Sequence, residues 1–458
     1  MMAEFTIREI CKATGAQVIQ ESAKVFHEVS TDTRTLQPGQ LFVALTGDNF
    51  DGHHFIALAA EKGAAGAVLS REISEVPPGI TVFIVKNTLE ALQSLARFHR
   101  QRFDIPVIAV TGSNGKTTTK DMLAAALSSR FHVLKTEGNF NNEIGLPLTL
   151  LRLTKEHGAA VVEMGMRALG EIRELVGIAL PNVAVVTNVG ETHMELLGSL
   201  ENVASAKGEL VEGIGENGLT ALNADDANVR AMGKKSRGQV VYYGFGPEAF
   251  VRAENVRTRS QENQTVTTFD CRSPRGMFPV ELPAAGKHNV YNVLAAIVIA
   301  WELGLSPQEI QQGIHSFVPS AMRLSVLRRG RYTIVNDAYN ASPMSMAAAL
   351  ETLQDLSSGR KVAVLGDMLE LGPVAVEAHR RIGRQAANCG VEVVITVGTL
   401  AGHIADAAAE AGVIHTMACD THEQAVRELE RRVQPGDTIL IKGSRGMAME
   451  KILDLFEG

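Results

Sequence analysis

Short apolar runs rich in β-branched residues alternate with amphipathic stretches of helical length along most of the chain. The run at 105–110, Ile-Pro-Val-Ile-Ala-Val, precedes a glycine turn and has the signature of a buried parallel strand. The same reasoning predicts strands at 159–162, 183–186, 219–222 and 240–243, with helices after Lys116, Gly170, Ser199 and Asp225. Alternating strands and helices predict a mostly parallel sheet covered by helices.

The flanking segments carry the same rhythm. Before residue 102 the pattern predicts strands at 40–45 and 64–69 and a helix at 88–101. Residues 250–282 predict short polar strands, and residues 289–303 predict a helix. The last segment predicts a doubly wound Rossmann-like domain, with strands at 332–335, 361–365, 391–397, 413–417 and 438–441. A length of 458 residues agrees with about three domains, so we predict an α/β protein with domains at 1–102, 103–318 and 319–458.

Composition and charge exclude several classes of protein. Hydrophobic residues make up 45% of the chain and charged residues 21%, as in an ordinary packed globular protein. A net charge of -7 gives no field that would gather nucleic acid or an anionic membrane. The four cysteines lie far apart without CxxC spacing, so neither a disulfide framework nor a cysteine zinc site is predicted.

The N-terminus and the apolar runs argue against export and membrane insertion. The stretch from Met1 to Ile10 contains acidic residues and helical periodicity, unlike the basic start and apolar core of a signal peptide. Runs such as 183–186 fall far short of the roughly 20 apolar residues that span a bilayer. We therefore expect a reducing, cytoplasmic compartment.

A glycine-rich loop carries the strongest chemical signal. The strand at 105–110 runs into Thr111-Gly112-Ser113-Asn114-Gly115-Lys116-Thr117-Thr118, and a helix is predicted at 116–129. Glycines let backbone N–H groups converge on phosphate oxygens, the lysine neutralises them, and the threonine hydroxyl can hold Mg²⁺. Val110 stands where the longer motif has its first glycine, so this is the compact Gly-x-x-Gly-Lys-Thr form. The loop predicts ATP or GTP binding; the alternative is a glycine turn with a chance lysine.

Two more predicted strands end in candidate metal ligands. Glu163 follows the strand at 159–162, and Asn188-Val189-Gly190-Glu191-Thr192-His193 follows the strand at 183–186. Ligands in an open parallel sheet bind at the carboxyl ends of strands, where a carboxylate and an imidazole can reach a metal near the phosphates. Taken alone, Glu163 fits a solvated strand end equally well, and His193 fits a structural histidine.

Taken together, these segments resemble the Mur ligase family of ATP-dependent amide-forming enzymes, together with folylpolyglutamate synthetase. The resemblance covers nearly the whole chain. It rests on Thr111 to Thr118, Glu163, Asn188 to His193, Ala206-Lys207-Gly208-Glu209, Gly286-Lys287-His288-Asn289-x-x-Asn292 and the Rossmann-like last domain.

Further motifs narrow the resemblance to the family members that add D-alanyl-D-alanine to UDP-N-acetylmuramoyl-tripeptide. They are Ser30-Thr31-Asp32-Thr33-Arg34, Phe42 to Leu45, Asp51-Gly52-His53, Gly138 to Pro147, Asn336 to Pro343 and Leu365 to Gly372. The Asp-Asn-Pro-Arg tetrapeptide of the diaminopimelate-adding members does not occur in the sequence. Two motifs depart from the usual pattern: Thr-Asp-Thr-Arg replaces Asp-Ser-Arg, which leaves the uridine contacts open, and Ala-Ser-Pro replaces Ala-Asn-Pro.

The resemblance implies a fold and a reaction. The expected fold has a small α/β N-terminal UDP-binding domain, a central P-loop ATPase domain and a C-terminal Rossmann-like domain. ATP and Mg²⁺ are the expected cofactors, UDP-N-acetylmuramoyl-tripeptide and D-alanyl-D-alanine the substrates, and an acyl phosphate the intermediate. We expect a monomer without nucleic-acid or membrane partners, whose C-terminal domain closes over ATP.

The resemblance also assigns catalytic roles. Lys116, His193 and Lys207 are the expected catalytic residues, and the loop from Gly112 to Thr118 binds the phosphates. Thr117 and Glu163 are expected to hold Mg²⁺ on the ATP side, and His193 a second Mg²⁺. Lys207 matches the family lysine that CO₂ converts into a carbamate ligand; the alternative is a surface lysine on the helix at 200–211.

Other residues are expected to bind nucleotide or substrate. Asn289 and Asn292 share one helix face and would read adenine or ribose, while Arg323, Asp337 and Tyr339 would reach ATP from the last domain. The expected substrate contacts are Ser30, Thr31, Asp32, Arg34, Asp51, His53, Asn139, Asn141, Asn142, Asn340, Lys442 and Arg445. Without the resemblance, the helical asparagines also fit a helix cap and a polar face, and Asp337, residues 51–53 and the asparagine-rich loop also fit plain turns.

Three other functions stay open at this point. A tripeptide-forming relative or a folylpolyglutamate synthetase would share the central motifs, although folate enzymes lack the Asp-Gly-His first domain. A P-loop kinase or switch NTPase would carry a lid or a guanine-reading Asn-Lys-x-Asp, and the sequence offers neither. A non-catalytic nucleotide-binding module would not need the candidate metal ligands.

Overall fold

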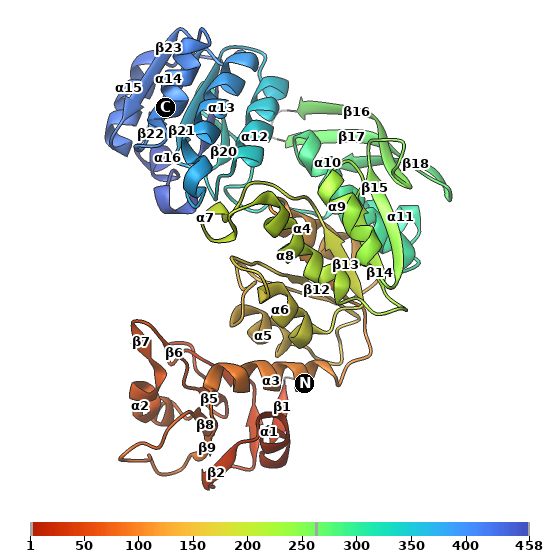
Figure 1. Cartoon of the computed structure of the whole chain (residues 1–458), viewed down its shortest axis with the longest axis vertical. Coiled ribbons are helices and arrows are strands. Elements are labelled where there is room, and N and C mark those ends of the chain that lie inside the picture. Colours follow the sequence, from red (N-terminus) through yellow and green to blue (C-terminus); the bar gives the residue numbers. More distant parts are fainter. Residues whose placement is uncertain (1–2, 262–263, 457–458) are drawn as a thin grey trace.

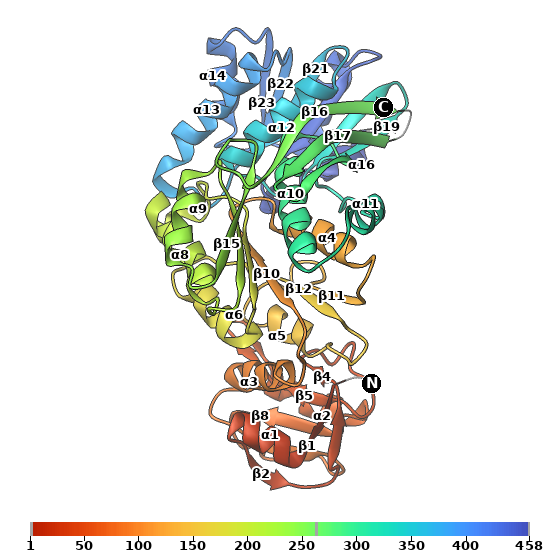
Figure 2. The same ribbon diagram turned by 90° about the vertical axis from the view of Figure 1, so that its right-hand side faces the viewer.

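Three α/β units follow one another along the long axis of the computed structural model, which describes residues 3–261 and 264–456 (Figures 1 and 2). The N-terminal unit lies at one end, the central unit in the middle and the C-terminal unit at the other end in both views. The predicted three-domain α/β class is confirmed, and each main sheet lies inside one of the predicted ranges. None of the described helices has the length and apolar character needed to cross a membrane.

The N-terminal unit is built on a five-stranded sheet with the order β2-β9-β8-β5-β4. Its strands are β2 (Gln17–Gln20), β4 (Val29–Ser30), β5 (Leu41–Val43), β8 (Gly66–Leu69) and β9 (Thr81–Ile84). All neighbours are parallel except β2 and β9. Two small antiparallel pairs accompany the sheet, β1 (Glu4–Thr6) with β3 (Val25–His27) and β6 (Thr46–Gly47) with β7 (Phe50–Asp51). The helices are α1 (Ile7–Thr14), η1 (Gly52–Phe55), α2 (Ile56–Glu61) and α3 (Thr88–Arg100).

Helix α3 joins the N-terminal unit to the central unit through a shared apolar core. It begins at Asn87, whose side-chain oxygen accepts from the Leu89 N–H (2.8 Å) and caps the first turn. It packs against α1 on one side and against α5 (Gly145–Leu150) and α6 (Glu171–Ala179) on the other. Phe5 and Leu92 therefore belong to the same hydrophobic cluster as Leu150. The two units have one continuous core.

The glycine-rich loop lies at the point where the strand order of the central sheet reverses direction. The order of this sheet is β11-β12-β10-β13-β14-β15-β16-β17-β18, and neighbours are parallel as far as β16. The chain leaves β10 toward one edge of the sheet and leaves β13 toward the other, and a crevice at such a point is where open α/β sheets bind ligands. The parallel strands are β10 (Val107–Thr111), β11 (Val133–Lys135), β12 (Ala159–Glu163), β13 (Val183–Val186), β14 (Leu219–Asn223) and β15 (Gln239–Gly244).

Helices cover both faces of this sheet. Helices α4 (Lys116–Leu127), α10 (Lys287–Glu302) and α11 (Pro307–His315) pack together on one face. Helices α5, α6 and α8 (Leu200–Glu212) lie on the face that shares its core with α3. The short elements α7 (Met194–Leu197), α9 (Ala227–Ala231) and η2 (Met232–Lys235) complete the unit.

One prediction for this unit is wrong in length. Residues 250–282 form the long antiparallel strands β16 (Val251–Gln261), β17 (Gln264–Ser273) and β18 (Gly276–Leu282), which extend the central sheet. Polar residues such as Arg252 and Glu254 alternate with buried ones such as Ala253, because one face of the hairpin is exposed. In the sequence, that alternation resembles a series of short strands.

The C-terminal unit has a six-stranded sheet with the order β19-β20-β24-β21-β22-β23. The parallel strands are β20 (Tyr332–Asp337), β21 (Lys361–Gly366), β22 (Val393–Val397), β23 (His415–Cys419) and β24 (Thr438–Lys442). β19 (Ser325–Arg329) is an antiparallel edge strand that the pattern does not predict. The helices are α12 (Pro343–Leu356), η3 (Gly372–Val374), α13 (Ala375–Asn388), α14 (Gly402–Glu410), α15 (His422–Arg432), η4 (Arg445–Met447) and α16 (Lys451–Leu455). Separate apolar clusters fill the two faces of the sheet, so this unit has its own core.

Candidate active site

The glycine-rich loop follows β10 directly and is held by the end of β13. A Cβ on Gly112 would lie 1.8 Å from Thr187 Oγ1, and a Cβ on Gly115, where φ is 81°, would lie 2.5 Å from Asn292 Oδ1. Thr187 Oγ1 donates to the Asn114 carbonyl (2.6 Å), and the Asn114 N–H donates to Asn188 Oδ1 (2.8 Å). Close approach therefore requires both glycines, and the loop is preformed.

Lys116 gives the loop a positive charge, and Asn114 gives it a hydrogen-bond donor that is unpaired among the described residues. Lys116 Nζ donates to the Gly112 carbonyl (2.7 Å). Burial lowers the pKa of Lys116, the Glu163 carboxylate opposes this, and the charge of Arg323 adds to it. Asn114 Nδ2 is buried without a hydrogen-bond partner in the part of the chain that the structure describes. A cation and an unpaired donor on one loop are groups that phosphate oxygens would satisfy.

The Glu163 carboxylate, at the end of β12, accepts hydrogen bonds from two residues that are predicted to belong to the site. Thr117 Oγ1 donates to one carboxylate oxygen (2.8 Å) and Asn141 Nδ2 donates to the other (2.7 Å). The Glu163 residue is 2% exposed. A hydroxyl beside a carboxylate fits the oxygen ligands that Mg²⁺ takes next to phosphates. Residues 3–261 and 264–456 hold no cluster of three or more His, Cys, Asp or Glu side chains suited to a metal, so an ion here would depend on phosphate and water ligands.

His193 lies just beyond β13, on the other side of the loop. It precedes α7 in the left-handed conformation, with φ of 54°. Its Nδ1 is 2.7 Å from Glu370 Oε2 of the C-terminal unit. Burial lowers the pKa of His193, Glu370 raises it, and the charges of Lys116 and Lys207 lower it further. His193 therefore lies within electrostatic range of both lysines.

Lys207 enters the same region from α8, which begins at the Ser199 cap. Lys207 is 2% exposed. Burial lowers the pKa of Lys207 well below its ordinary value, and the charge of Lys116 lowers it further; among the described residues no carboxylate opposes these effects. The alternative of an ordinary surface lysine is thus excluded by the fold.

Three residues of the C-terminal unit are predicted to bind nucleotide. Arg323 reaches the glycine-rich loop, and Tyr339 and Asp337 support Arg323. Arg323 Nη2 donates to Thr117 Oγ1 (3.0 Å), and its guanidinium lies 4.0 Å from the centre of the Tyr339 ring. Asp337 Oδ1 accepts from the Leu324 N–H (3.1 Å) and so holds the segment that carries Arg323. The structure brings these residues together with the glycine-rich loop.

The C-terminal unit is docked on the loop at a second point. Ser342 caps α12 and donates from its hydroxyl to Asn114 Oδ1 (2.9 Å). With Arg323 on Thr117, the C-terminal unit contacts both the middle and the end of the glycine-rich loop. A nucleotide bound at this loop would therefore touch both units.

Asn289 and Asn292 lie behind the loop with their amides already paired. Asn292 Oδ1 accepts from Thr119 Oγ1 (3.1 Å), and Asn292 Nδ2 donates to Asn289 Oδ1 (3.0 Å). Asn289 Nδ2 donates to the Ala285 carbonyl (2.7 Å). Both residues are buried, and the bond between Asn292 and Thr119 joins α10 to α4. Their predicted contact with adenine or ribose stays a prediction and would require these bonds to exchange.

The predicted substrate residues of the asparagine-rich loop lie in different environments. Asn139 is exposed, whereas Asn141 is bonded to Glu163 at the metal side of the site. Asn142 Oδ1 accepts from the Gly145 N–H (2.9 Å) and holds the first turn of α5. This contact fits the alternative of a plain turn. Substrate contact by Asn139, Asn141 and Asn142 stays a prediction.

The N-terminal unit presents several predicted residues at the carboxyl edge of its parallel strands. Ser30 ends β4, and its hydroxyl accepts from the Asp32 N–H (3.2 Å). Arg34 is exposed and pairs with Asp32 (2.6 Å), which holds the pKa of that carboxyl below its usual range. Thr31 is partly exposed beside them. Among these four residues, exposure increases from the buried Ser30 to the exposed Arg34.

His53 is engaged inside the N-terminal unit. Its side chain is 1% exposed, its Nδ1 lies 2.7 Å from Asp51 Oδ1, and its Nε2 accepts from the Ser70 N–H (3.0 Å). Both ring nitrogens are used inside the fold, which favours the plain-turn alternative, and substrate contact by His53 stays a prediction. Asp51 also pairs with the exposed Arg71 (2.5 Å) and caps η1.

Lys442 lies at the end of the last strand, β24, and is engaged inside the fold. It is 2% exposed and pairs its ammonium with Asp337 Oδ2 (2.5 Å) and the Asn340 carbonyl (2.9 Å). Its ammonium is paired inside the fold, so its predicted contact with the dipeptide stays a prediction that would require these bonds to exchange. Arg445 and Asn340 remain at the surface, where the Arg445 side chain pairs with Glu450 (2.8 Å).

Sequence reasoning missed Glu370. It stands in the Leu365–Gly372 segment that supports the family resemblance, just past the end of β21, but has no predicted role. A carboxylate beyond the carboxyl end of a parallel strand was the available signal.

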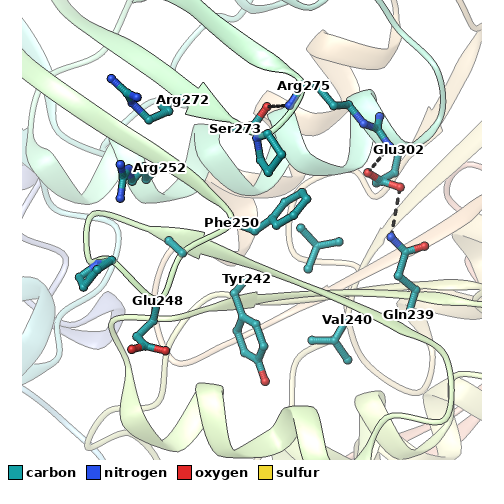
Figure 3. Close-up of a pocket in the computed structure, with 14 residues that line it drawn as sticks. Gln239, Val240, Tyr242, Glu248, Phe250, Arg252, Arg272, Ser273, Arg275 and Glu302 are labelled. Carbon is teal, nitrogen blue, oxygen red and sulfur yellow. Dashed lines mark hydrogen bonds and ion pairs between the residues drawn. The ribbon is translucent and has the colours of Figure 1, made fainter.

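A cavity of about 660 Å³ lies apart from these residues (Figure 3). It is bordered by β15, the segment before β16 and the turn between β17 and β18. Arg275 and Gln239 both bond to Glu302 there, at 2.7 and 3.3 Å. Its lining contains none of the predicted site residues.

Three family models match the chain. The Mur ligase family catalytic domain matches residues 25–100, the Mur ligase middle domain matches 110–300, and the Mur ligase glutamate ligase domain matches 322–445. The chain is 40% identical to the UDP-N-acetylmuramoyl-tripeptide–D-alanyl-D-alanine ligase of Bacillus subtilis (strain 168), over 98% of this chain and 97% of the relative. It is 38% identical to the protein of the same name from Escherichia coli (strain K12), over 93% and 92%.

Solved structures show the same similarity. The structure is similar to MurF from Acinetobacter baumannii, with a TM-score of 0.92, 32% identity and 100% coverage of both chains. It is also similar to MurF ligase from Thermotoga maritima in complex with ADP, with a TM-score of 0.84, 29% identity and coverage of 94% of this chain and 97% of the other.

Proposed function

The chain belongs to the Mur ligase family, and we propose that it uses ATP to join D-alanyl-D-alanine to UDP-N-acetylmuramoyl-tripeptide. The product is UDP-N-acetylmuramoyl-pentapeptide, a precursor for peptidoglycan synthesis. One observation carries the assignment of the site: a preformed phosphate loop lies between Glu163 on one side and His193 with Lys207 on the other.

The reaction needs an acyl phosphate, because an amine does not displace oxide from a carboxylate in water. The tripeptide carboxylate attacks the γ-phosphorus of ATP, the bond to the β-phosphate oxygen breaks, and ADP leaves. The dipeptide amine then attacks the acyl carbon, phosphate leaves with the electron pair of the C–O bond, and the nitrogen loses a proton. Two anions meet in the first step, so charge neutralisation and positioning are the main catalytic tasks.

The chain's cationic groups lie where the first step requires them. Lys116 exchanges its bond to the Gly112 carbonyl for phosphate oxygens, and the unpaired Asn114 amide donates beside it. Arg323 reaches the same place from the C-terminal unit through Thr117. Docking of that unit therefore adds positive charge to the phosphate site.

The donor groups fit two divalent cations. Thr117 and Glu163 would hold Mg²⁺ beside the phosphates, and His193 with a carbamylated Lys207 would hold a second ion. When bound, the ions would supply the positive charge that lets the carboxylate approach ATP. Lys207 supports this assignment because its lowered pKa favours the neutral amine, which adds CO₂ and releases a proton to become a carbamate.

We also place the reaction in the cytoplasm and in a single chain. ATP is available in the cytoplasm, and each proposed catalytic group comes from one polypeptide.

Phosphate release tests the assignment. The purified chain should release phosphate from ATP only when both UDP-N-acetylmuramoyl-tripeptide and D-alanyl-D-alanine are present, and mass spectrometry should show the pentapeptide product. Lys116→Met should remove this activity, whereas Lys155→Met, at an exposed lysine outside the site, should retain it. Phosphate release that ignores the dipeptide would refute the proposal.

A further inference from the structure

The segment that carries His193 is held between the phosphate loop and the C-terminal unit. We call residues 190–197 the His193 loop; it contains α7, which Figure 1 shows below the C-terminal unit. At its start, Ser113 Oγ donates to the Gly190 carbonyl (3.0 Å), and Thr192 Oγ1 donates to Ser113 Oγ (3.1 Å). The loop is thus tied directly to the phosphate-binding segment.

The other side of the His193 loop is held by Glu370 and its neighbours. His193 Nδ1 lies 2.7 Å from Glu370 Oε2, and the Glu195 N–H donates to the Glu370 carbonyl (3.3 Å). Arg381 on α13 pairs with Glu191 at the base of the loop. Glu370 therefore contacts His193, the candidate metal ligand, whereas Arg381 contacts the His193 loop without touching His193.

The contact determines which ring nitrogen of His193 is free. His193 Nδ1 and Glu370 Oε2 are 2.7 Å apart, and a carboxylate oxygen accepts a hydrogen bond from an imidazole N–H. Nδ1 must therefore carry the hydrogen, which leaves the Nε2 lone pair available for a cation. Both partners have left-handed backbones, φ 54° for His193 and 63° for Glu370, so their conformations depend on the surrounding contacts.

We propose that Glu370 is a positioning residue for the second cation, acting through His193. It fixes the ring and tautomer of His193, so that the cation site is complete only when the C-terminal unit is docked. The inference rests on the proposed role of His193. It adds a physical link between domain docking and metal binding, since hydrogen bonds to the outer nitrogen of a ligating histidine set its orientation and basicity.

Manganese binding separates this role from a purely mechanical one. The full chain, with a non-hydrolysable ATP analogue and UDP-N-acetylmuramoyl-tripeptide, is titrated with Mn²⁺, and free Mn²⁺ is measured by electron paramagnetic resonance. Wild type should bind two ions. Glu370→Ala should keep the first and weaken the second by about 10- to 100-fold, and Glu370→Gln, whose neutral oxygen accepts more weakly, should fall between them.

Two control variants sharpen the comparison. Arg381→Ala removes the other contact to the His193 loop and should weaken the second ion less than Glu370→Ala does. Glu377→Ala removes an exposed glutamate that pairs with Arg384 on the same helix, and should bind as wild type. Binding of the ATP analogue without metal should be equal in all variants.

Several outcomes would overturn the inference. Unchanged or tighter second-ion binding in Glu370→Ala would show that Glu370 does not support His193 or competes with the cation. Equal losses in Glu370→Ala and Arg381→Ala would reduce Glu370 to a domain contact. A wild type that binds only one Mn²⁺ would instead overturn the proposed second cation itself, and that result is distinct because it does not involve the variants.

Discussion

Acid should destabilise this protein through His99, a histidine buried between the N-terminal and central units. On α3, the His99 Nε2 nitrogen donates to the Leu153 carbonyl (2.9 Å), and the ring packs against Phe5 and Phe103 at centroid distances of 5.7 and 5.0 Å. Burial lowers the pKa of His99 to about 4; the bond to Leu153 opposes this shift and the charge of Arg102 adds to it. The folded protein therefore keeps His99 neutral.

The size of the effect follows from proton linkage. A histidine in the unfolded chain titrates near pH 6.5, so above that pH neither state is protonated and stability does not change. As the pH falls from about 6.5 toward 4, the unfolded chain binds a proton that the folded protein does not, and stability falls by about 1.4 kcal/mol per pH unit. At pH 5 His99 should therefore cost about 2 kcal/mol. His288, whose pKa burial also lowers to about 4, should add a similar slope.

Urea unfolding of a neutral variant isolates the His99 share. His99→Gln retains an N–H donor for the Leu153 carbonyl but cannot take up a proton. Unfolding is followed at pH 7.5 and 5.0 by the fluorescence of the one tryptophan, Trp301. Between these two pH values His99→Gln should lose about 2 kcal/mol less than wild type, and His415→Gln, at an exposed histidine, should follow wild type. Equal losses in wild type and His99→Gln would refute the reasoning.

Three further predictions concern the site and its support. Lys207→Ala should lose most phosphate release, and a short carboxylate such as formate should restore part of it; failure of rescue would argue against the carbamate. Arg323→Ala removes a charged donor from Thr117 and should lower kcat/KM for ATP by about 10- to 100-fold; unchanged ATP kinetics would separate this contact from catalysis. Lys442→Met leaves Asp337 buried without its partner and should lower the free energy of unfolding by about 3–5 kcal/mol. Adding Asp337→Asn should recover part of that loss in urea titrations, and a double variant no more stable than the single one would contradict the pairing.

The sequence predicts the buried parallel strands well and the exposed ones poorly. The run at 183–186 is apolar throughout and forms β13 with the predicted limits, because a strand covered by helices on both faces needs no polar residue. β19 escapes prediction, since Ser325–Arg329 is a partly exposed edge strand with a polar sequence. The hairpin of β16 and β17 is predicted too short for a related reason: its exposed face carries polar residues that look like strand ends.

The candidate site divides along a similar line. Glu163 and His193 can be grouped with the phosphate loop from sequence, because parallel strand ends meet at one edge of a sheet. The burial of Lys442 cannot be predicted in this way, because it depends on Asp337, a partner distant in the chain. Glu370 was missed because its partner, His193, belongs to another structural unit. Local pattern carries no information about contacts that form only when two units dock.

The core shared through α3 also limits which substrates the protein can use. Gln93 Nε2 on α3 donates to the Glu143 carbonyl of the central unit (3.2 Å), so a polar contact reinforces the apolar connection between the first two units. On the proposed assignment, the uridine end of the donor is held in one of these units and its carboxylate must reach ATP in the other. Their separation is therefore a fixed length, and a peptide stem that is shorter or longer would leave the carboxylate short of the γ-phosphate or beyond it. On the same assignment, rigidity between these two units would select the donor by its length.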